Sequence, residues 1–457
     1  MTEERGLERQ LGLWTATGVV VAGMIGTGII TISGFMAADV PHPGWMLGLW
    51  LLGGVLALAG ALSVGELSAM FPKAGGNYIF VSEGYGPMWG FLSGWTTLIV
   101  GFSAPVAAGA LGAMEYFSTY VPALSPVDAA EIPIGIGTLK VSWGHLAGAA
   151  AIVIFGSIHY VGVRFGAFIQ NSMTILKFGV WIVIVAAGFI WGAGDWSHLQ
   201  VDAGVPAAAE MLPKAGVSLI FVMFAYTGWD SATYIAGEIK QPGRNLPLSL
   251  LLGTLGVVVL YLAMNLLYLY ALPVSEMAGK LAIGSVVFQA LLGESAILWT
   301  DGILALSLLA AVSAYLLIGP RVYYAMARDR VFMPAFGRVH PKYGTPSRAI
   351  VLQMSFAILL MFTGTFDQLL LYIGFCLTLF ATLAVAAVYV LRWRRPDHPR
   401  PYRTWGYPIT PALFIIVSVW MMTYTLLERP AETLWGIGTV AAGLPFYWYY
   451  RKHKSTG

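Results

Sequence analysis

Three glycines in the first long apolar segment are the residues whose spacing most clearly points to chemistry. Gly23, Gly26 and Gly28 fall within six residues, at a depth where a membrane-spanning backbone normally satisfies its polar groups inside a helix. Glycine weakens a helix and lets another group approach the main chain closely. A helix broken here leaves one end with free N–H groups and another with free carbonyls. These two ends would bind the carboxylate and the ammonium of a zwitterion without any buried charged side chain.

The sequence places each half of such a zwitterion on a short stretch of main chain. The carboxylate would lie on the amides near Thr27 and Gly28, and the ammonium on the carbonyls from Val21 to Met24. The alternative is a glycine-rich packing face, since pairs of small residues are common where membrane helices meet.

Membrane-spanning helices must position these glycines. Of the 457 residues, 58% are hydrophobic and only 10% are charged, and the apolar runs approach or exceed the ~20 residues that cross a bilayer. A transmembrane β-barrel would instead show short alternating segments. No signal peptide is expected, because Met1 to Gln10 is polar and the following apolar run is too long. The sequence predicts an all-α polytopic membrane protein with twelve spans, at 12–37, 45–70, 88–119, 144–162, 166–192, 213–239, 246–271, 296–326, 347–365, 368–391, 407–427 and 433–450.

The basic residues outside the spans predict the orientation. An even number of spans puts both termini on one side, and most lysines and arginines fall on that side. Only Lys140, Lys214, Lys280 and Arg429 fall on the other. Because basic residues are enriched in cytoplasmic loops, the N-terminal segment 1–11 and the tail 451–457 are predicted to be cytoplasmic. The membrane is expected to be the plasma membrane.

The spans divide into two units of opposite orientation. Residues 12–192 hold spans one to five and residues 213–391 hold spans six to ten, and the odd number of crossings inverts the second unit. Residues 407–450 add two further spans. Span six corresponds to span one and carries Phe224-Ala225-Tyr226-Thr227-Gly228-Trp229, where polar and aromatic residues interrupt an apolar run. Paired interruptions in two inverted halves are a sequence indication of a transporter binding site.

Two charged side chains within the predicted spans are candidates for a role in transport. Lys177 lies within span five, where an ammonium costs about 2.5 kcal/mol or more and therefore needs a partner. Asp230 follows the predicted break in span six. We expect it to cap the second half-helix or to form local hydrogen bonds, with a bound proton or a cationic substrate as alternatives.

Several motifs resemble those of a known family. Gly23-Met24-Ile25-Gly26-Thr27-Gly28-Ile29-Ile30 resembles the G-x-I-G-S-G-I-F signature of the amino acid–polyamine–organocation (APC) superfamily. Phe224 to Trp229, with Glu238 to Pro242 and Asn245-Leu246-Pro247 after it, is similar to the F-A-Y-x-G-W…E-x-x-x-P…N-L-P pattern of its L-type amino acid transporter (LAT) branch. The segments Glu66 to Tyr78 and Gly319 to Asp329 also resemble family segments.

The resemblance implies a leucine-transporter-type (LeuT) fold of five-plus-five inverted repeats with broken helices one and six. It assigns the substrate carboxylate to Gly26, Thr27 and Gly28. The ammonium is assigned to carbonyls near Ala22, Met24, Phe224, Ala225 and Thr227, and Phe224 is the expected aromatic gate. Thr27 stands where the family usually has Ser, and Ile30 where it usually has Phe.

The resemblance also implies a role for Lys177, whose ammonium is expected to touch the unwound part of span one and to stand in for a sodium ion. Sodium dependence is therefore not expected. The alternatives are a proton-carrying role in coupled transport and a permanent structural tie between spans five and one. Tyr226 is expected either to hydrogen-bond Lys177 or the substrate, or to pack as an ordinary aromatic.

The remaining candidates are weaker. Glu66 and Glu115 are expected to be interfacial or packing residues. Spans three, eight and ten are expected to complete the side-chain pocket, with Ser103, Ser313 and Cys376 as possible contributors. The basic stretches 328–348 and 392–403 are read as topology determinants, with anionic lipid headgroups as an alternative ligand. The segment Phe71 to Gly86 is expected to form short helices at the cytoplasmic mouth.

Other function classes find little support. The seven histidines are scattered and form no metal-binding motif, which argues against an embedded enzyme. No repeated carbonyl filter or ring of like charges indicates a channel, and no P-loop indicates ATP-driven transport. No cofactor and no nucleic-acid partner is expected. Nor is a disulfide-linked accessory subunit expected, because the single cysteine, Cys376, lies inside a span.

The sequence therefore predicts a sodium-independent secondary transporter of amino acids that works by alternating access, as an exchanger or as a proton symporter. Small to medium neutral amino acids are the expected substrates. The alternative is a carrier of cationic amino acids or polyamines that uses Asp230 as counter-ion.

Overall fold

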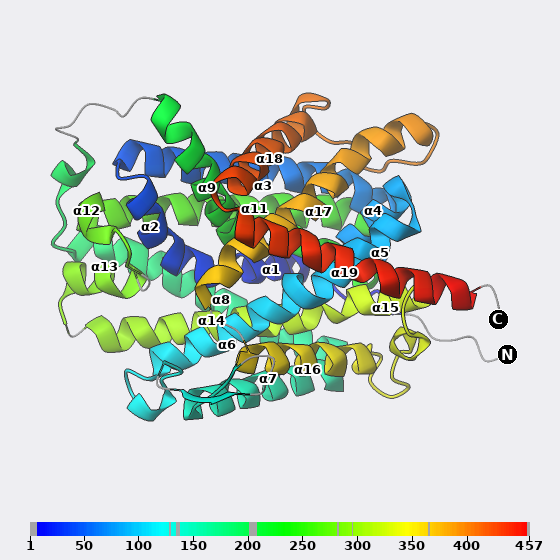
Figure 1. The fold of residues 1–457 in the computed structure, drawn as a ribbon, viewed down its shortest axis with the longest axis horizontal. Helices are drawn as coiled ribbons and strands as arrows, with labels where there is room; N and C mark the ends of the chain where they lie inside the picture. The colour runs from blue at the N-terminus through cyan, green and yellow to red at the C-terminus, as the bar shows by residue number, and fades with distance from the viewer. Residues whose placement is uncertain are drawn as a thin grey trace.

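The fold is a bundle of long helices with one small hairpin. The computed structural model describes residues 7–127, 129–133, 138–200, 208–280, 283–294, 296–363 and 366–454. The outer parts of the predicted N-terminal segment 1–11 and tail 451–457 lie outside these residues. Figure 1 shows the long helices lying side by side along the longest axis of the molecule.

Among the described residues, nine helical stretches are long and apolar enough to cross a membrane. They are Leu13–Asp39, Pro43–Met70, Pro87–Phe117, Trp143–Val161, Val163–Trp191, Pro242–Ala271, Ala296–Arg328, Ile373–Arg394 and Ile409–Glu428. The other three predicted spans correspond to helices α9 (Ala208–Tyr226), α16 (Ser347–Thr363) and α19 (Pro430–Lys454), which fall outside that set. Twelve crossings and the inverted repeat therefore stay predictions, whereas a polytopic helical membrane protein is established.

The first span is broken where its glycines predict. Helix α1 (Leu13–Met24) ends and α2 (Thr27–Asp39) begins after two non-helical residues. Ile25 is extended, and Gly26 takes φ −132° and ψ −149°. The break leaves the last carbonyls of α1 and the first N–H groups of α2 without partners inside their own helices.

The sixth predicted span is also broken. Helix α9 ends at Tyr226, and the short helices α10 (Ser231–Tyr234) and η4 (Ala236–Glu238) follow before α11 (Pro242–Ala271). Gly228 has a φ of +105°, a left-handed conformation that side chains with a Cβ rarely adopt. This single glycine therefore allows the chain to leave the helix.

A third irregularity, which the sequence analysis missed, lies in the third span. Helix α5 (Pro87–Thr96) passes through the π-helix η1 (Thr97–Ser103) into α6 (Ala104–Phe117). Pro105 lacks an N–H group, so the carbonyl of Gly101 has no α-helical donor four residues later. π-Helical turns inside α-helices occur frequently at functional sites.

Burial separates central helices from peripheral ones. Of the most apolar 18 residues within Leu13–Asp39, 83% are buried. The corresponding share is 28% in α8 (Val163–Trp191) and in α18 (Ile409–Glu428). In Figure 1, α1 lies near the middle of the bundle, while α7 (Trp143–Val161) and α16 follow its lower edge. The broken first span packs chiefly against α8, α9, α11 and α14 (Ala296–Ile318), and α3 (Pro43–Met70) packs against α11.

The connections contain further elements. Helix α4 (Asn77–Tyr85) confirms the short helix expected between spans two and three. The strands β1 (Ala130–Pro133) and β2 (Thr138–Val141) form an antiparallel hairpin that was not predicted, and neither were α12 (Val274–Met277) and α13 (Ile283–Leu292). The remaining elements are η2 (Pro122–Leu124), η3 (Trp196–Leu199), α15 (Pro320–Arg328), η5 (Pro334–Gly337) and α17 (Phe366–Arg394).

Candidate functional site

A pocket lies at the two helix breaks. Six of the predicted site residues line it: Met24, Gly26, Thr27, Gly28, Phe224 and Ala225. Pro105 and Gly109 of α6, Leu308 and Ala311 of α14, and Tyr315 of α14 complete its wall. The pocket therefore joins the N-terminal end of α2 to a largely apolar surface from two other helices.

The glycines of the first break have different surroundings. A Cβ on Gly28 would lie 2.5 Å from Ala225 Cα, so this glycine lets α2 rest directly on the end of α9. A Cβ on Gly26 would meet no heavy atom within 4 Å, which means that this backbone faces open space. Close packing and an accessible backbone therefore occur two residues apart.

Lys177 reaches the break from α8. Its side chain is buried, and Nζ donates hydrogen bonds to the carbonyl oxygens of Ile25 and Ala22, the latter at 3.4 Å. The expected contact between this ammonium and the unwound part of the first span is confirmed. A cation thus lies at the C-terminal end of α1, where the helix dipole favours positive charge.

Two tyrosine hydroxyls also donate hydrogen bonds to the carbonyls at this end of α1. Tyr261 donates to Met24 O at 2.7 Å and lies 3.2 Å from Ala225 O, and Tyr315 donates to Gly23 O at 2.7 Å. The sequence analysis missed both tyrosines, although each is a polar aromatic residue within an apolar span. Since a carbonyl oxygen has two lone pairs, these carbonyls retain the capacity to accept a second donor.

Tyr226 is not brought to the pocket. Its hydroxyl donates to Trp50 O at 3.1 Å, and its ring packs against Trp50 and Tyr261 with centroid distances of 5.7 and 5.1 Å. The last turn of α9 therefore directs Tyr226 toward α3 and α11. Of the two alternatives for this residue, the structure favours packing.

A second pocket shares Tyr315 with the first. Thr227, Gly228 and Asp230 contribute from the second break. The other lining residues are Asn77, Thr97, Gly101, Phe102, Met223, Trp229, Ser231, Tyr234, Tyr315, Leu377, Thr378, Ala381 and Phe414. The π-helix η1 and helix α17 thus take part, so spans three, eight and ten all contribute to the two pockets, as expected.

Asp230 is buried in this second pocket. One of its carboxylate oxygens accepts hydrogen bonds from Asn77 Nδ2 at 2.7 Å and from Tyr234 OH at 3.2 Å. It occupies the N-cap position of α10, but its side chain accepts no capping bond. The side-chain cap is therefore absent, and the expected local hydrogen bonding is present through Tyr234, the last residue of α10, while Asn77 of α4 adds a bond from a distant segment.

The three weak pocket candidates line neither pocket. Ser313 Oγ pairs with His159 Nε2 at 2.9 Å, and Ser103 Oγ is buried without a hydrogen-bond partner among the described residues. Cys376 is buried in a small cluster with Val100 and Phe375. These side chains pack between helices instead of facing the breaks.

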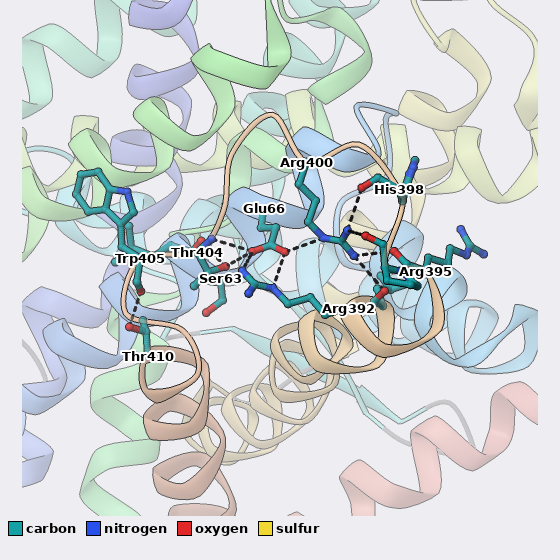
Figure 2. Close-up of polar contacts among 12 residues, drawn as sticks. Ser63, Glu66, Arg392, Arg395, His398, Arg400, Thr404, Trp405 and Thr410 are labelled. Atoms are coloured by element: carbon teal, nitrogen blue, oxygen red, sulfur yellow. Dashed lines mark hydrogen bonds and ion pairs between the residues drawn. The ribbon is translucent and has the colours of Figure 1, made fainter.

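Glu66 anchors a buried ionic network near the end of α3. Its carboxylate accepts two hydrogen bonds from Arg392, at 2.9 and 2.7 Å, and lies 3.3 Å from Arg400 Nε. Thr404 adds bonds from its backbone N–H at 2.8 Å and its hydroxyl at 2.9 Å. Figure 2 shows Glu66 between the two arginines, joining α3 to α17 and the segment that follows it. Glu66 is thus a packing residue, as expected, while Glu115 accepts a bond from Ser125 Oγ at 3.0 Å.

Removing Glu66 is expected to be costly. Glu66→Ala leaves two arginines without their buried counter-ion, and we expect a loss of about 3–5 kcal/mol of folding free energy. Glu83→Ala is the matched control, because the Glu83–Arg395 pair is partly exposed and should contribute about 1 kcal/mol or less. Thermal midpoints of both purified variants test the difference. Equal midpoints would contradict a structural role for Glu66.

A second buried ion pair lies at the end of the second break. Arg321 of α15 donates to both carboxylate oxygens of Glu238, at 2.8 and 3.1 Å, and both side chains are fully buried. The backbone carbonyl of Glu238 accepts the N–H groups of Gln10 and Leu11. This pair therefore ties the residues before α1, the end of the second break and α15 together.

Comparison with known proteins gives consistent results. The serine/threonine exchanger SteT of Bacillus subtilis is 30% identical and aligns over the full length of both chains. The b(0,+)-type amino acid transporter 1 of Mus musculus is 27% identical over 98% of this chain and 89% of its own. The large neutral amino acids transporter small subunit 2 of the same species is 28% identical over 98% of this chain and 82% of its own.

These relatives are transporters and exchangers, not enzymes. A family model described as amino acid permease matches residues 11–443, which include both helix breaks, Lys177 and both pockets. The chain therefore belongs to the amino acid permease family of integral membrane transporters.

Proposed function

We propose that this protein is a sodium-independent secondary transporter that moves small to medium neutral amino acids across the plasma membrane by alternating access. The observation that carries the proposal is the pocket at the break between α1 and α2. It combines exposed helix-end backbone with an apolar wall, and a lysine ammonium lies directly beside it. The protein would hold its substrate between the two broken helices.

Each part of an amino acid has a matching surface in this pocket. The N–H groups of the first turn of α2, at Thr27 and Gly28, favour a carboxylate because a helix N-terminus carries positive partial charge. The carbonyls of Met24 and Ala225, and that of Phe224, would accept the ammonium. Pro105, Gly109, Leu308 and Ala311 would contact an apolar or short side chain, and Phe224 would close the pocket as a gate.

Lys177 supports sodium independence. Its ammonium already supplies a positive charge to the carbonyls of the unwound segment, the oxygen ligands that a sodium ion would need. An ammonium at this point takes the place that a bound ion would otherwise fill. Exchange and proton symport remain the two coupling modes under this proposal, and the relative named a serine/threonine exchanger favours exchange.

A flux measurement tests the proposal. The purified protein is reconstituted into liposomes without sodium, either empty or preloaded with unlabelled serine, with and without an inward proton gradient. An exchanger should take up labelled serine only into preloaded vesicles, and a symporter should fill empty vesicles only with the gradient. Sodium should change neither rate. Absence of amino acid flux under all these conditions would contradict the proposal.

The second candidate is a carrier of cationic amino acids or polyamines. Asp230 favours it, since an intramembrane carboxylate lines the second pocket and would pair with an ammonium or guanidinium. Labelled lysine and putrescine in the same vesicles distinguish the two. If the second candidate holds, lysine uptake should exceed serine uptake and should fall in Asp230→Asn; if the first holds, Asp230→Asn should leave serine as the preferred substrate.

We also propose the predicted topology, with inverted units at 12–192 and 213–391, two further spans at 407–450 and both termini in the cytoplasm. The matching breaks in the first and sixth spans support it. Because Cys376 is buried, we propose that no disulfide tethers an accessory subunit. Membrane lipid is the remaining expected partner.

A further inference from the structure

A third pocket lies far from the helix breaks. It is lined by Pro87, Arg330, Val331, Tyr447, Tyr450 and Arg451. These residues come from the start of α5, the residues after α15 and the end of α19, which meet at the right of Figure 1. None of its lining residues lines either of the pockets at the helix breaks.

Among the described residues, the two arginines have no acidic partner. Neither Arg330 nor Arg451 forms a side-chain hydrogen bond or ion pair within the described part of the chain, and both are exposed. The adjacent carboxylate, Asp329, accepts a hydrogen bond from Tyr78 OH at 2.7 Å. Two positive charges therefore face one cavity, and no described carboxylate pairs with either of them.

Local geometry adds to this positive character. Pro87 is the first residue of α5, so the free N–H end of a ten-residue helix lies beside the pocket. Arg330 has a φ of +58°, an unfavourable conformation for a residue with a Cβ. The backbone turn after α15 thus presents an arginine where Gly or Asn would be less strained.

Exposed aromatic residues flank the pocket. Trp89 of α5 is 43% exposed, and Trp448 and Tyr449 of α19 are 58% and 59% exposed, directly before Arg451 ends the apolar run. Tryptophan and tyrosine are enriched at the level of lipid headgroups. The pocket therefore lies at the membrane surface. Tyr447 and Tyr450, which also line it, carry hydroxyl groups that can donate hydrogen bonds alongside the arginines.

We infer that this pocket binds the phosphate headgroup of an anionic phospholipid. Arginine guanidinium groups match phosphate oxygens with two parallel hydrogen bonds, and basic pockets between membrane helices bind such headgroups. The acyl chains would run along the exposed aromatic face of α5 and α19. A free phosphate ion has the same anionic group but lacks these chains.

The test is a ligand titration of the purified full-length protein in neutral detergent. Dioctanoyl phosphatidylglycerol, dioctanoyl phosphatidylcholine and inorganic phosphate are added at matched ionic strength, and the thermal midpoint is followed. Phosphatidylglycerol should raise the midpoint saturably, and phosphatidylcholine should not. In the double variant Arg330→Asn with Arg451→Gln, the half-maximal concentration should rise at least ~10-fold, because charge-assisted contacts to phosphate are lost.

The matched control is Arg338→Asn with Arg348→Gln, which removes the same charge from two exposed arginines that do not line the pocket. It should titrate like the wild type. Arg451→Gln alone, at an exposed helix end, keeps the test valid if the double variant does not fold, and should give a smaller shift. Equal loss in the control, equal stabilisation by inorganic phosphate, or no response to phosphatidylglycerol would each overturn the inference.

Discussion

Lys177→Met is expected to reduce amino acid uptake at least ~100-fold, because two hydrogen bonds from a charged donor are lost at the break in the first span. Methionine fills a similar volume but leaves the carbonyls of Ala22 and Ile25 without their donor. The unwound segment would then lose the cation that fixes its shape. Exchange uptake into liposomes that contain equal amounts of reconstituted protein measures the effect.

Two further variants separate the role of the charge from general damage. Lys280→Met removes an exposed lysine and should retain wild-type uptake. Lys177→Arg keeps the charge but replaces a compact ammonium with a larger, planar guanidinium group. Uptake should therefore fall less than in Lys177→Met. Wild-type uptake by Lys177→Met would show that the ammonium at the break is dispensable.

Gly228→Ala is expected to abolish transport and to lower stability by about 3 kcal/mol or more, from backbone strain and overpacking together. The φ of +105° disfavours any residue with a Cβ. That Cβ would also lie 2.5 Å from Gly23 C and 2.7 Å from Gly23 O. The two breaks touch at this point, so the substitution would push the end of α1 away from the second break.

Gly179→Ala is the matched control for this substitution. Gly179 lies inside α8, and a Cβ there would meet no heavy atom within 4 Å. Alanine also favours a helix over glycine by roughly 0.5–1 kcal/mol, so this variant should be at least as stable as the wild type. Thermal midpoints and uptake are measured for both. A stable, active Gly228→Ala would show that the left-handed turn and the close contact are not required.

Local features allowed much of the site to be predicted. Gly26 and Gly228 disrupt helices through their own backbone preferences, and the breaks occur where the sequence predicts them. Six predicted residues line one pocket because they lie on the two broken segments themselves. Lys177 was recognisable because an ammonium inside an apolar run needs a partner nearby.

Contacts between distant segments could not be predicted in the same way. Whether Tyr226 faces the substrate or Trp50 depends on the rotation of α9 against α3, and the carboxylate of Asp230 turns to Asn77 because α4 packs there. Pro105, Leu308 and Thr378 line the two pockets only because of which faces of their separate helices meet there.

The sequence by itself determined that this is a helical membrane protein with interrupted first and sixth spans, because hydropathy and glycine act locally along the chain. The tertiary structure alone decided which side chains surround those interruptions. Tyr261 and Tyr315 donate to Met24 and Gly23 across more than 200 residues, and Glu66 pairs with Arg392 across 326. Such pairs form only when packed helices bring them together, since no short-range pattern encodes the relative rotation of two helices.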